Sequence, residues 1–446
     1  MRLPSVALGA ALALAPLAAV LGQDTTARGV TIGLSYDPSS RPGVVVLPIT
    51  GVTGDSVRAI LQRDLDYSDR FTVVSVDGTD PNAFRGITAG AALNYELFGR
   101  LGAVAVVQAT PTASGLHVAL HDVAKGSVLS VEEFVLAASA GSRDWRMAVH
   151  GISDEIERWI TGQKGIAQTR IAYVEANSIR VIDSDGAGEE RVSVTPNALS
   201  PAWHPAGTML VYSTFGASSR ITVLDLRTGQ SRPLTNATPA NTNLTPVFSP
   251  DGSTIVYSHA SENGSDLYLV MTEESSPARR ISVGRGTDNA QPTFSPDGRR
   301  LAFTSGRAGH PEVYIMDADG TNAELLTSFD FGDKNYRSDP DWSPDGRLVA
   351  FQSQFSSGGF QLMTISLRDR STKLLTSEGS NEQPSWAPDG RHIVFTSTRS
   401  GRRQLWVLDA ESGRMRQLTR TSGARLAAWS ARLGSSAVAP DAARRP

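Results

Sequence analysis

The chain has 446 residues, a formal net charge of -3 and no cysteine. This charge gives no basic footprint for nucleic acid and no polybasic block for an anionic membrane surface. Without cysteine there can be no disulfide, no thiolate metal site and no lipid-modified N-terminal cysteine. The length exceeds what one hydrophobic core usually supports, so we expect two domains of ordinary globular composition.

Residues 1–22 are predicted to be a cleaved secretory signal peptide. Arg2 precedes an apolar run, Val6–Val20, and a small residue stands before the expected cleavage at Gln23. The run is interrupted by Pro16 and is short for a membrane span, which disfavours an uncleaved anchor and direct membrane insertion. The mature protein is therefore expected outside the cytoplasm.

Residues 23–40 form a polar, glycine-dotted N-terminal extension with one short β-like run, Val30–Leu34. Two interpretations stay open for this segment. It is either a disordered leader, as chain starts often are, or a tail that binds a partner by adding a strand.

Residues 41–162 are predicted to form a small α/β domain. Runs rich in β-branched residues alternate with segments whose apolar residues recur at helical spacing. The expected order is strand Gly43–Ile49, helix Val57–Leu65, strand Phe71–Val76, helix Ala89–Leu101, strand Ala103–Ala109, a hairpin of Leu116–His121 and Val128–Leu136, and helix Trp145–Ile160. This order is typical of a two-layer α/β sandwich.

Residues 163–433 contain a repeat built on Pro-x-Trp/Phe-Ser-Pro-Asp-Gly. The aromatic positions are Trp203, Phe248, Phe294, Trp342, Trp386 and Trp429, at steps of 45, 46, 48, 44 and 43 residues. Such a period is typical of propeller blades. Each Ser-Pro-Asp-Gly stretch lies between two apolar runs and predicts a hairpin turn, because proline presets φ and glycine takes positive φ. Two further strand patterns follow each copy, which gives four strands per blade.

The two ends of the repeat array predict how the ring closes. Ile171–Val174, Ile179–Asp183 and Arg191–Ser193 resemble the second, third and fourth strands of a blade that lacks its first strand. The orphan run Arg425–Ala431 supplies that strand. We therefore expect a six-bladed β-propeller closed by the C-terminal strand, which removes open sheet edges. Residues 434–446, rich in alanine and arginine, are predicted to be a disordered tail.

A search for reactive side chains predicts no catalytic residue, no metal site and no cofactor. His117 and His121 share one strand face, but no third ligand stands at zinc-motif spacing. His204 replaces the serine of one repeat turn. The Asp-Gly aspartates Asp251, Asp297, Asp345 and Asp389 are expected to be solvated turn residues.

The loops that lead into the first strand of each blade are the predicted binding surface. They are Asn241–Thr245, Thr287–Gln291, Asp333–Asp339, Ser377–Gln383 and Thr421–Arg425. Each loop precedes the innermost strand, so all of them are expected on one face around the mouth of the central channel. Loops on a rigid scaffold are where binding residues usually lie.

The order of signal peptide, α/β domain with the run Arg41–Ile49, junction at residues 162–174 and Ser-Pro-Asp-Gly propeller resembles the TolB family of the Tol-Pal system. The resemblance covers nearly the whole mature chain. It implies a non-enzymatic, monomeric periplasmic protein that bridges the peptidoglycan-associated lipoprotein Pal to the inner-membrane Tol complex. It also implies a role in outer-membrane integrity and in envelope constriction during cell division.

The resemblance implies that Pal docks over the channel mouth and that TolA binds the N-terminal segment, here Gln23 to about Leu34. The matching positions for Pal are Asn243, Thr245, Asn289, Gln291, Arg337, Asn381, Glu382 and Arg425. Two alternatives stay open. One is a paralogous periplasmic scaffold that binds another envelope protein or a glycan. The other is a propeller-type hydrolase or lyase, which would need a catalytic domain or converging histidines.

Overall fold

The computed structural model describes residues 41–76, 93–193, 196–216, 219–236, 241–273, 277–282, 287–327, 336–355 and 358–434. The predicted signal peptide and N-terminal extension, and residues 435–446 of the predicted tail, lie outside these ranges. Among the helices in the described ranges, none is long and apolar enough to cross a membrane.

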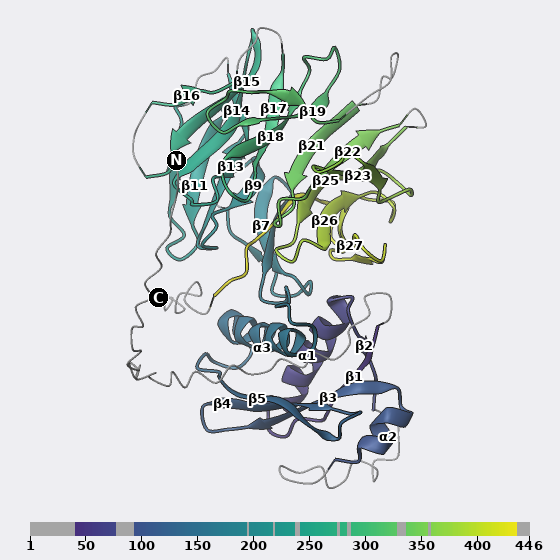
Figure 1. Cartoon of the computed structure of the whole chain (residues 1–446). Coiled ribbons are helices and arrows are strands. Elements are labelled where there is room, and N and C mark those ends of the chain that lie inside the picture. Colours follow the sequence, from purple (N-terminus) through teal and green to yellow (C-terminus); the bar gives the residue numbers. More distant parts are fainter. Residues whose placement is uncertain are drawn as a thin grey trace, which may run out of the picture. The chain divides into compact units, whose positions relative to one another are not determined.

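The first described part of the chain is built around a five-stranded sheet (Figure 1). Its strands, in the order in which they lie side by side, are β2 (Thr72–Val73), β1 (Gly43–Val46), β3 (Ala103–Pro111), β4 (Gly115–Asp122) and β5 (Ser127–Val135). The strand β1 runs parallel to β2 and β3, whereas β4 and β5 continue as antiparallel neighbours of β3. Gly43 must be glycine, because a Cβ there would lie 2.2 Å from the carbonyl oxygen of Gly102.

Two helices, α1 (Gly54–Tyr67) and α3 (Arg143–Thr161), pack on one face of this sheet. The apolar stripe of α3 is fully buried there, as the periodicity of the sequence predicts. Ser142 caps the helix by accepting a hydrogen bond from the Trp145 amide, and Gly162 ends it with a φ of 78°. A third helix, α2 (Tyr95–Arg100), is shorter than expected and begins after Asn94, whose side chain accepts from the Leu97 amide. The predicted residues 89–92 of this helix lie outside the described ranges.

Six four-stranded antiparallel sheets follow, and we number them as blades from the inner strand outward. Blade 1 is β29 (Ala424–Trp429), β6 (Arg170–Glu175), β7 (Ser178–Asp183) and β8 (Glu190–Arg191). Blade 2 is β9 (Ala198–Trp203), β10 (Met209–Thr214), β11 (Arg220–Asp225) and β12 (Ser231–Pro233). Blade 3 is β13 (Thr242–Phe248), β14 (Thr254–Ser261), β15 (Gly264–Met271) and β16 (Arg279–Arg280).

Blade 4 is β17 (Asn289–Phe294), β18 (Arg300–Ser305), β19 (Glu312–Asp317) and β20 (Glu324–Leu325). Blade 5 is β21 (Tyr336–Trp342), β22 (Leu348–Gln354), β23 (Phe360–Ser366) and β24 (Thr372–Leu374). Blade 6 is β25 (Asn381–Trp386), β26 (His392–Ser397), β27 (Gln404–Asp409) and β28 (Met415–Gln417). The fold class predicted from the sequence, an α/β domain and a six-bladed propeller, is confirmed.

The repeat turns have the chemistry that the sequence predicts. In blade 3, the Ser249 hydroxyl accepts from the Thr254 amide at 3.0 Å, and the Asp251 carboxylate accepts from the Ser253 amide at 3.0 Å. Gly252 takes a φ of 76°. These short-range bonds satisfy the turn locally, and a tight hairpin of the same kind opens blades 2 to 6.

The ring is closed by β29, which pairs antiparallel with β6 and so joins the end of the propeller to its beginning. The Trp429 indole donates to the Thr169 hydroxyl at 2.7 Å, and the Arg170 amide donates to the Ser430 hydroxyl at 2.9 Å. The predicted closure by the C-terminal strand is therefore confirmed.

Ending the chain before Arg425 is expected to destabilise the whole propeller. The deletion removes buried Trp429 and opens two sheet edges, and loss of a buried tryptophan alone costs about 3–5 kcal/mol. The melting temperature should fall by roughly 10 °C or more. A chain that ends at Gly434 keeps β29 and is the matched control. An unchanged melting temperature in the shorter chain would contradict this mode of closure.

Candidate functional site

The inner strand of each blade connects two faces of the ring. We call the face at which the inner strands begin the loop face, and the opposite face, which carries the Ser-Pro-Asp-Gly turns, the turn face. The described parts of the predicted binding loops, namely residues 241–245, 287–291, 336–339, 377–383 and 421–425, lie on the loop face. Residues 333–335 of the third loop lie outside the described ranges.

Each inner strand contains one residue with a positive φ, at the same place in all six blades. These residues are Ser200, Thr245, Gln291, Asp339, Gln383 and Leu426, with φ between 48° and 59°. A shift of register marks the same place in every inner pair. In five blades the next residue is proline, which normally keeps the residue before it extended. Such strain costs on the order of 1–3 kcal/mol per residue, so other contacts must compensate for it.

Contacts between neighbouring blades compensate for this strain. The amide of the positive-φ residue donates to a polar side chain of the preceding blade: Gln291 to the Ser258 hydroxyl at 3.1 Å and Gln383 to the Gln352 side chain at 2.9 Å. The ring closes in the same way, because the Leu426 amide donates to the Gln383 side chain at 3.1 Å. At these positions the residue with positive φ therefore links its blade to the preceding one by a hydrogen bond beside the channel.

The bulged strands surround a cavity of about 290 Å³ in the channel, to which all six inner strands contribute. Two half-buried carboxyl groups, Asp339 and Asp341, line it. Burial raises the pKa of both groups to about 7, against the hydrogen bonds that Asp341 accepts from the Trp386 amide and the Thr293 hydroxyl. At neutral pH both groups are thus partly protonated, and the channel carries less negative charge than two ordinary carboxylates would give it.

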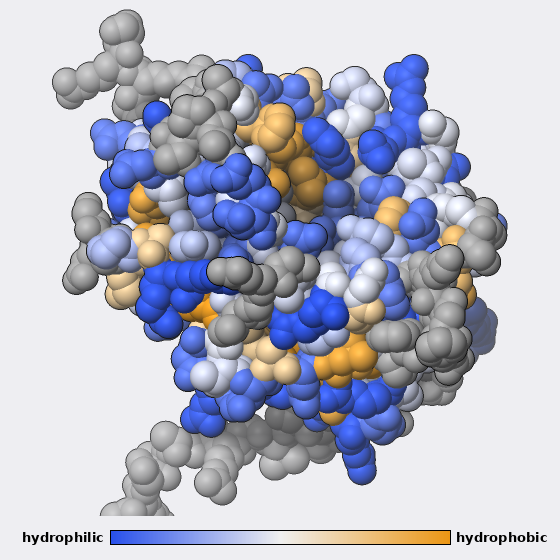
Figure 2. All heavy atoms as spheres, turned by 90° about the horizontal axis from the view of Figure 1, so that it is seen from above, coloured by the Kyte–Doolittle hydropathy of each residue, from blue (hydrophilic) through white to orange (hydrophobic). Residues whose placement is uncertain are grey.

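A second cavity of about 650 Å³ lies at the loop-face end of blades 3 to 5. Leu244, Ala290 and Tyr336 contribute apolar surface to its lining, and Asp288 and His310 contribute polar groups. Figure 2 looks onto this face, which is mostly hydrophilic around a hollow where apolar surface is exposed. A concave site with an apolar floor and a polar rim suits a protein partner that inserts an apolar side chain.

Three of the predicted contact residues are buried instead of exposed. Asn243, Asn289 and Asn381 are the first or second residues of their inner strands, and at most 3% of their surface is accessible. The Asn381 carbonyl accepts from the Ser397 hydroxyl at 2.7 Å and from the Arg399 guanidinium at 3.0 Å. Asn289 has the same two contacts, with Ser305 at 2.9 Å and Arg307 at 3.1 Å. These asparagines therefore hold the loops in place through buried hydrogen bonds, and a contact of theirs with Pal stays a prediction.

The other five predicted contact residues are partly accessible. Thr245 and Gln291 belong to the ring of positive φ, and both line the 650 Å³ cavity. The Arg337 guanidinium pairs with buried Glu312 at 2.8 Å, which fixes it in place. Glu382 accepts from the Ser380 hydroxyl at 2.9 Å, and half-buried Arg425 lies at the start of β29. These residues thus lie on one face, but their contacts differ from one residue to the next.

Tyr336 lies in the predicted loop Asp333–Asp339 but was not among the predicted Pal contact positions. Its ring is 38% exposed and meets Phe360 edge to face, with 5.8 Å between the ring centres. The residue lies within the predicted loop, and an aromatic side chain at the end of an otherwise polar loop is the signal that could have identified it.

Two groups of carboxylates and a histidine could offer ligand atoms to a metal: Asp64, His150 and Asp185, and Asp69, His392 and Asp409. Arginines already pair with both groups, at 2.8 Å from Arg146 to Asp185 and at 2.9 Å from Arg391 to Asp409. We therefore interpret both as ion-pair networks. His117, considered above as a ligand, pairs with Glu133 at 2.6 Å on the sheet.

One repeat turn departs from the expected solvated form. Asp251 and Asp297 bond to their own turns near solvent, but the Asp389 side chain is only 6% exposed and accepts from His392 Nδ1 at 2.7 Å. The expectation that all four turn aspartates are solvated is therefore wrong for Asp389. The reason is that this part of the turn face is covered by the α/β domain.

Replacing Asn381 by alanine is expected to reduce stability by about 1–3 kcal/mol, because Ser397 and Arg399 would lose their buried partner. Replacement of exposed Arg402 on the same blade should change stability by no more than about 0.5 kcal/mol. Urea unfolding of the two variants measures the difference. Equal stability of both variants would show that Asn381 does not anchor its loop.

Comparisons with known proteins agree with this architecture. The family model of the TolB beta propeller domain matches residues 157–433. The Tol-Pal system protein TolB of Polaromonas sp. is 32% identical over 195 residues, which are 41% of this chain and 43% of the relative. That of Methylococcus capsulatus is 33% identical over 214 residues, 44% of this chain and 49% of the relative. The chain therefore spans about half the length of the curated relatives that it matches.

The crystal structure of TolB from Acinetobacter baumannii superposes with a TM-score of 0.75 and 26% identity, covering 89% of this chain and 98% of that one. This likeness extends over both the α/β domain and the propeller. Because the family model matches more than half of its residues, the chain belongs to the TolB beta-propeller family.

Proposed function

We propose that this chain is a non-enzymatic periplasmic component of a Tol-Pal system, and that its loop face binds the peptidoglycan-associated lipoprotein Pal. The observation that carries the proposal is the 650 Å³ cavity on the loop face of a ring whose relatives are Tol-Pal proteins. The loop face is built on strands joined blade to blade, so it presents a preorganised surface to a partner.

The bridging role needs a second binding region. We assign it to the N-terminal segment, Gln23 to about Leu34, as the site for TolA of the inner-membrane Tol complex. This segment lies outside the described residues, and the assignment rests on the resemblance of the sequence alone. A protein that holds both partners would link the outer membrane to the inner membrane, which suits a role in outer-membrane integrity and in constriction during division.

The burial pattern divides the predicted contact residues into two kinds. Buried Asn243, Asn289 and Asn381 support the loops and would act on a partner only indirectly. The partly accessible residues Thr245, Gln291, Arg337, Glu382 and Arg425 are the ones that can touch Pal. To them we add Tyr336, because exposed aromatic residues beside a pocket often dominate binding energy.

Replacing Tyr336 by alanine is expected to weaken Pal binding by about 1–3 kcal/mol, or roughly 5- to 150-fold in the dissociation constant. The matched control is Arg347→Ala, because Arg347 is 84% exposed and lies on the turn face. The measurement is calorimetric titration of residues 23–446 with the periplasmic domain of Pal from the same organism. Loss of affinity in Tyr336→Ala but not in Arg347→Ala would place Pal on the loop face.

The same titration separates the alternatives. Binding that both variants leave unchanged would keep the Tol-Pal role and refute the loop face as the contact surface. If folded protein does not bind Pal at all, the Tol-Pal proposal fails. The chain would then be a periplasmic scaffold for another envelope protein or a glycan, and cross-linking in the periplasm would be the way to identify that partner.

A further inference from the structure

Two buried histidines lie where the α/β domain meets the turn face of the propeller. His150 is on α3 of the α/β domain, and His392 begins β26 of blade 6. Both side chains have no exposed surface. Each histidine lies between one carboxylate of its own domain and at least one carboxylate of the other domain. Each domain therefore contributes one histidine to the contact, and carboxylates to the histidine of the other domain.

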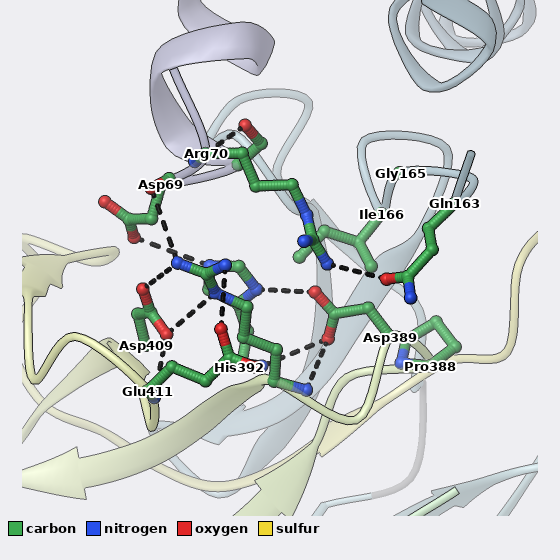
Figure 3. A network of polar contacts seen from close by, with 12 residues as sticks. Asp69, Arg70, Gln163, Gly165, Ile166, Pro388, Asp389, His392, Asp409 and Glu411 are labelled. Atoms are coloured by element: carbon green, nitrogen blue, oxygen red, sulfur yellow. Dashed lines mark hydrogen bonds and ion pairs between the residues drawn. The ribbon is translucent and has the colours of Figure 1, made fainter. Parts of the chain in front are cut away.

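His392 is surrounded by carboxylates on both sides (Figure 3). Its Nδ1 lies 2.7 Å from the Asp389 carboxylate of the same blade, and its Nε2 lies 3.4 Å from the Asp69 carboxylate at the end of α1. A neutral imidazole has only one N–H, so it cannot donate to both sides at once. Two carboxylates on opposite sides of the ring therefore favour the doubly protonated, cationic form.

His150 repeats this arrangement from the other domain. Its Nδ1 lies 2.8 Å from Asp64 on α1, which also accepts from the Ser153 hydroxyl at 2.6 Å. Its Nε2 faces the propeller, where Asp183 and Asp185 of blade 1 lie at 3.9 Å and 4.0 Å, and the Arg146 guanidinium, which pairs with both, lies at 3.5 Å. This imidazole therefore has a carboxylate within hydrogen-bond distance on one side and two carboxylates within ion-pair distance on the other.

Arginines pair with most carboxylates of both networks, but one carboxylate in each network is paired with the histidine. In the first network Arg146 pairs with Asp183 and Asp185, Arg63 with Asp185, and Arg170 with Asp183, at 2.8–3.3 Å. In the second network Arg391 pairs with Asp409 and Glu411, and Arg414 with Asp69. Asp64 and Asp389 are paired with the histidines. Loss of the proton would leave these two buried carboxylates without their partner charge, which is strongly unfavourable.

We propose that the contact between the α/β domain and the propeller is a protonation-dependent lock, in which each domain places one imidazolium between its own carboxylate and those of its partner domain. With both histidines charged the two domains are held as one body. Loss of the two protons converts attraction into repulsion among buried carboxylates and loosens the junction. The lock is independent of which partner the loop face binds.

The electrostatics of the junction agree with this geometry. Burial alone would lower the pKa of both histidines. The carboxylates outweigh burial and raise the pKa to about 9, through Asp64, Asp185 and Asp183 for His150 and through Asp389, Asp69 and Asp409 for His392. His392 in turn holds the pKa of Asp389 well below its usual range, although burial opposes this.

The sign of the pH dependence follows from linkage. A histidine with a pKa near 6.5 in the unfolded chain and about 9 in the fold stabilises the fold fully below about pH 6.5. This stabilisation is lost as the pH rises through about 9.

Two carboxyl groups at the same junction also titrate abnormally. Burial raises the pKa of Asp154 to about 7, and that of Glu157, which Arg70 approaches to 2.7 Å, to about 8. Their contribution to stability falls at lower pH than that of the histidines, so histidine variants are needed to separate the two effects.

The lock is tested by the pH dependence of the distance between the domains. Because the chain has no cysteine, Ser139→Cys in the α/β domain and Thr372→Cys in blade 5 introduce a single pair of exposed labelling sites. Spin-label distances are measured at about pH 6.5 and about pH 9.5. We expect a narrow distribution at the lower pH and a broader or shifted one at the higher pH. An identical distribution at both values would overturn the proposal.

Thermal unfolding supplies the second measurement. We expect the melting temperature of the unlabelled chain to fall by roughly 5 °C or more between these pH values, and this fall to be clearly smaller in His150→Gln, His392→Gln, where Asp154 and Glu157 alone contribute to it. His117→Gln is the matched control, because His117 is 44% exposed and pairs with Glu133 within the α/β sheet. It should keep the full pH dependence. If the double variant does not fold, each single variant should lose part of the dependence, and an undiminished fall in both would refute the lock.

Chelation distinguishes the lock from a metal site. Because the carboxylates are already paired with arginines, dialysis against EDTA should change neither the distances nor the melting temperature at about pH 6.5. Loosening of the junction by EDTA at this pH would instead assign the two networks to a bound cation and refute the proposal.

Discussion

The pairing of β29 with β6 is the interaction on which the rest of the structure depends. It joins strands separated by about 250 residues and leaves the propeller without an open inner edge. The residues beyond it reinforce the joint, because the Arg432 guanidinium donates to the carbonyls of Lys164, Gly165 and Pro388. A closed ring fixes every inner strand in the same direction. One face therefore collects the loops and the other collects the turns.

These two faces perform different tasks with the same repeat. On the loop face, the strained residues Gln291, Asp339 and Gln383 direct their amides to the preceding blade, and the polar loops surround a cavity. On the turn face, the repeat turn is a solvated Ser-Pro-Asp-Gly hairpin in blades 3 and 4, but in blade 6 it is Ala-Pro-Asp-Gly and a buried part of the domain contact. The difference lies in the residue three positions after the aspartate, which is Arg300 in blade 4 and His392 in blade 6. A change of residue within the repeat thus gives blade 6 its contact with the α/β domain.

Much of the fold could be predicted because its signals are local. The turn chemistry, the spacing of the aromatic residues and the orphan strand at Arg425 all lie within short segments, and together they specify six blades and their closure. The details of the site were less accessible. Proline after Gln291 or Gln383 favours an extended residue before it, whereas contacts with the preceding blade hold that residue at positive φ. The asparagines resembled solvated loop residues, because the arginines that bury them, such as Arg399, stand 18 residues further along the chain.

The junction between the domains could not be derived from the sequence at all. Asp69 lies beside His392, and His150 lies beside Asp183. The distances between these residues along the sequence correspond to no repeat pattern. Among the propeller histidines, His392 meets a carboxylate of the other domain, whereas His259 and His310 pair within their own blades, so their sequence positions gave no sign of the junction. Such networks form through contacts between distant parts of the chain. The secondary-structure propensities and hydrophobic patterns of a sequence give least information about them.

The measurement that tests the account most directly is hydrogen exchange of the full mature chain with and without the periplasmic domain of Pal. The account predicts slower exchange of backbone amides on the loop face, at residues 241–245, 287–291 and 336–339, with no change in the turns at 249–252 and 343–346. Protection confined to the turns, or no protection in a complex that forms, would contradict the claim that this ring presents its loop face to its partner.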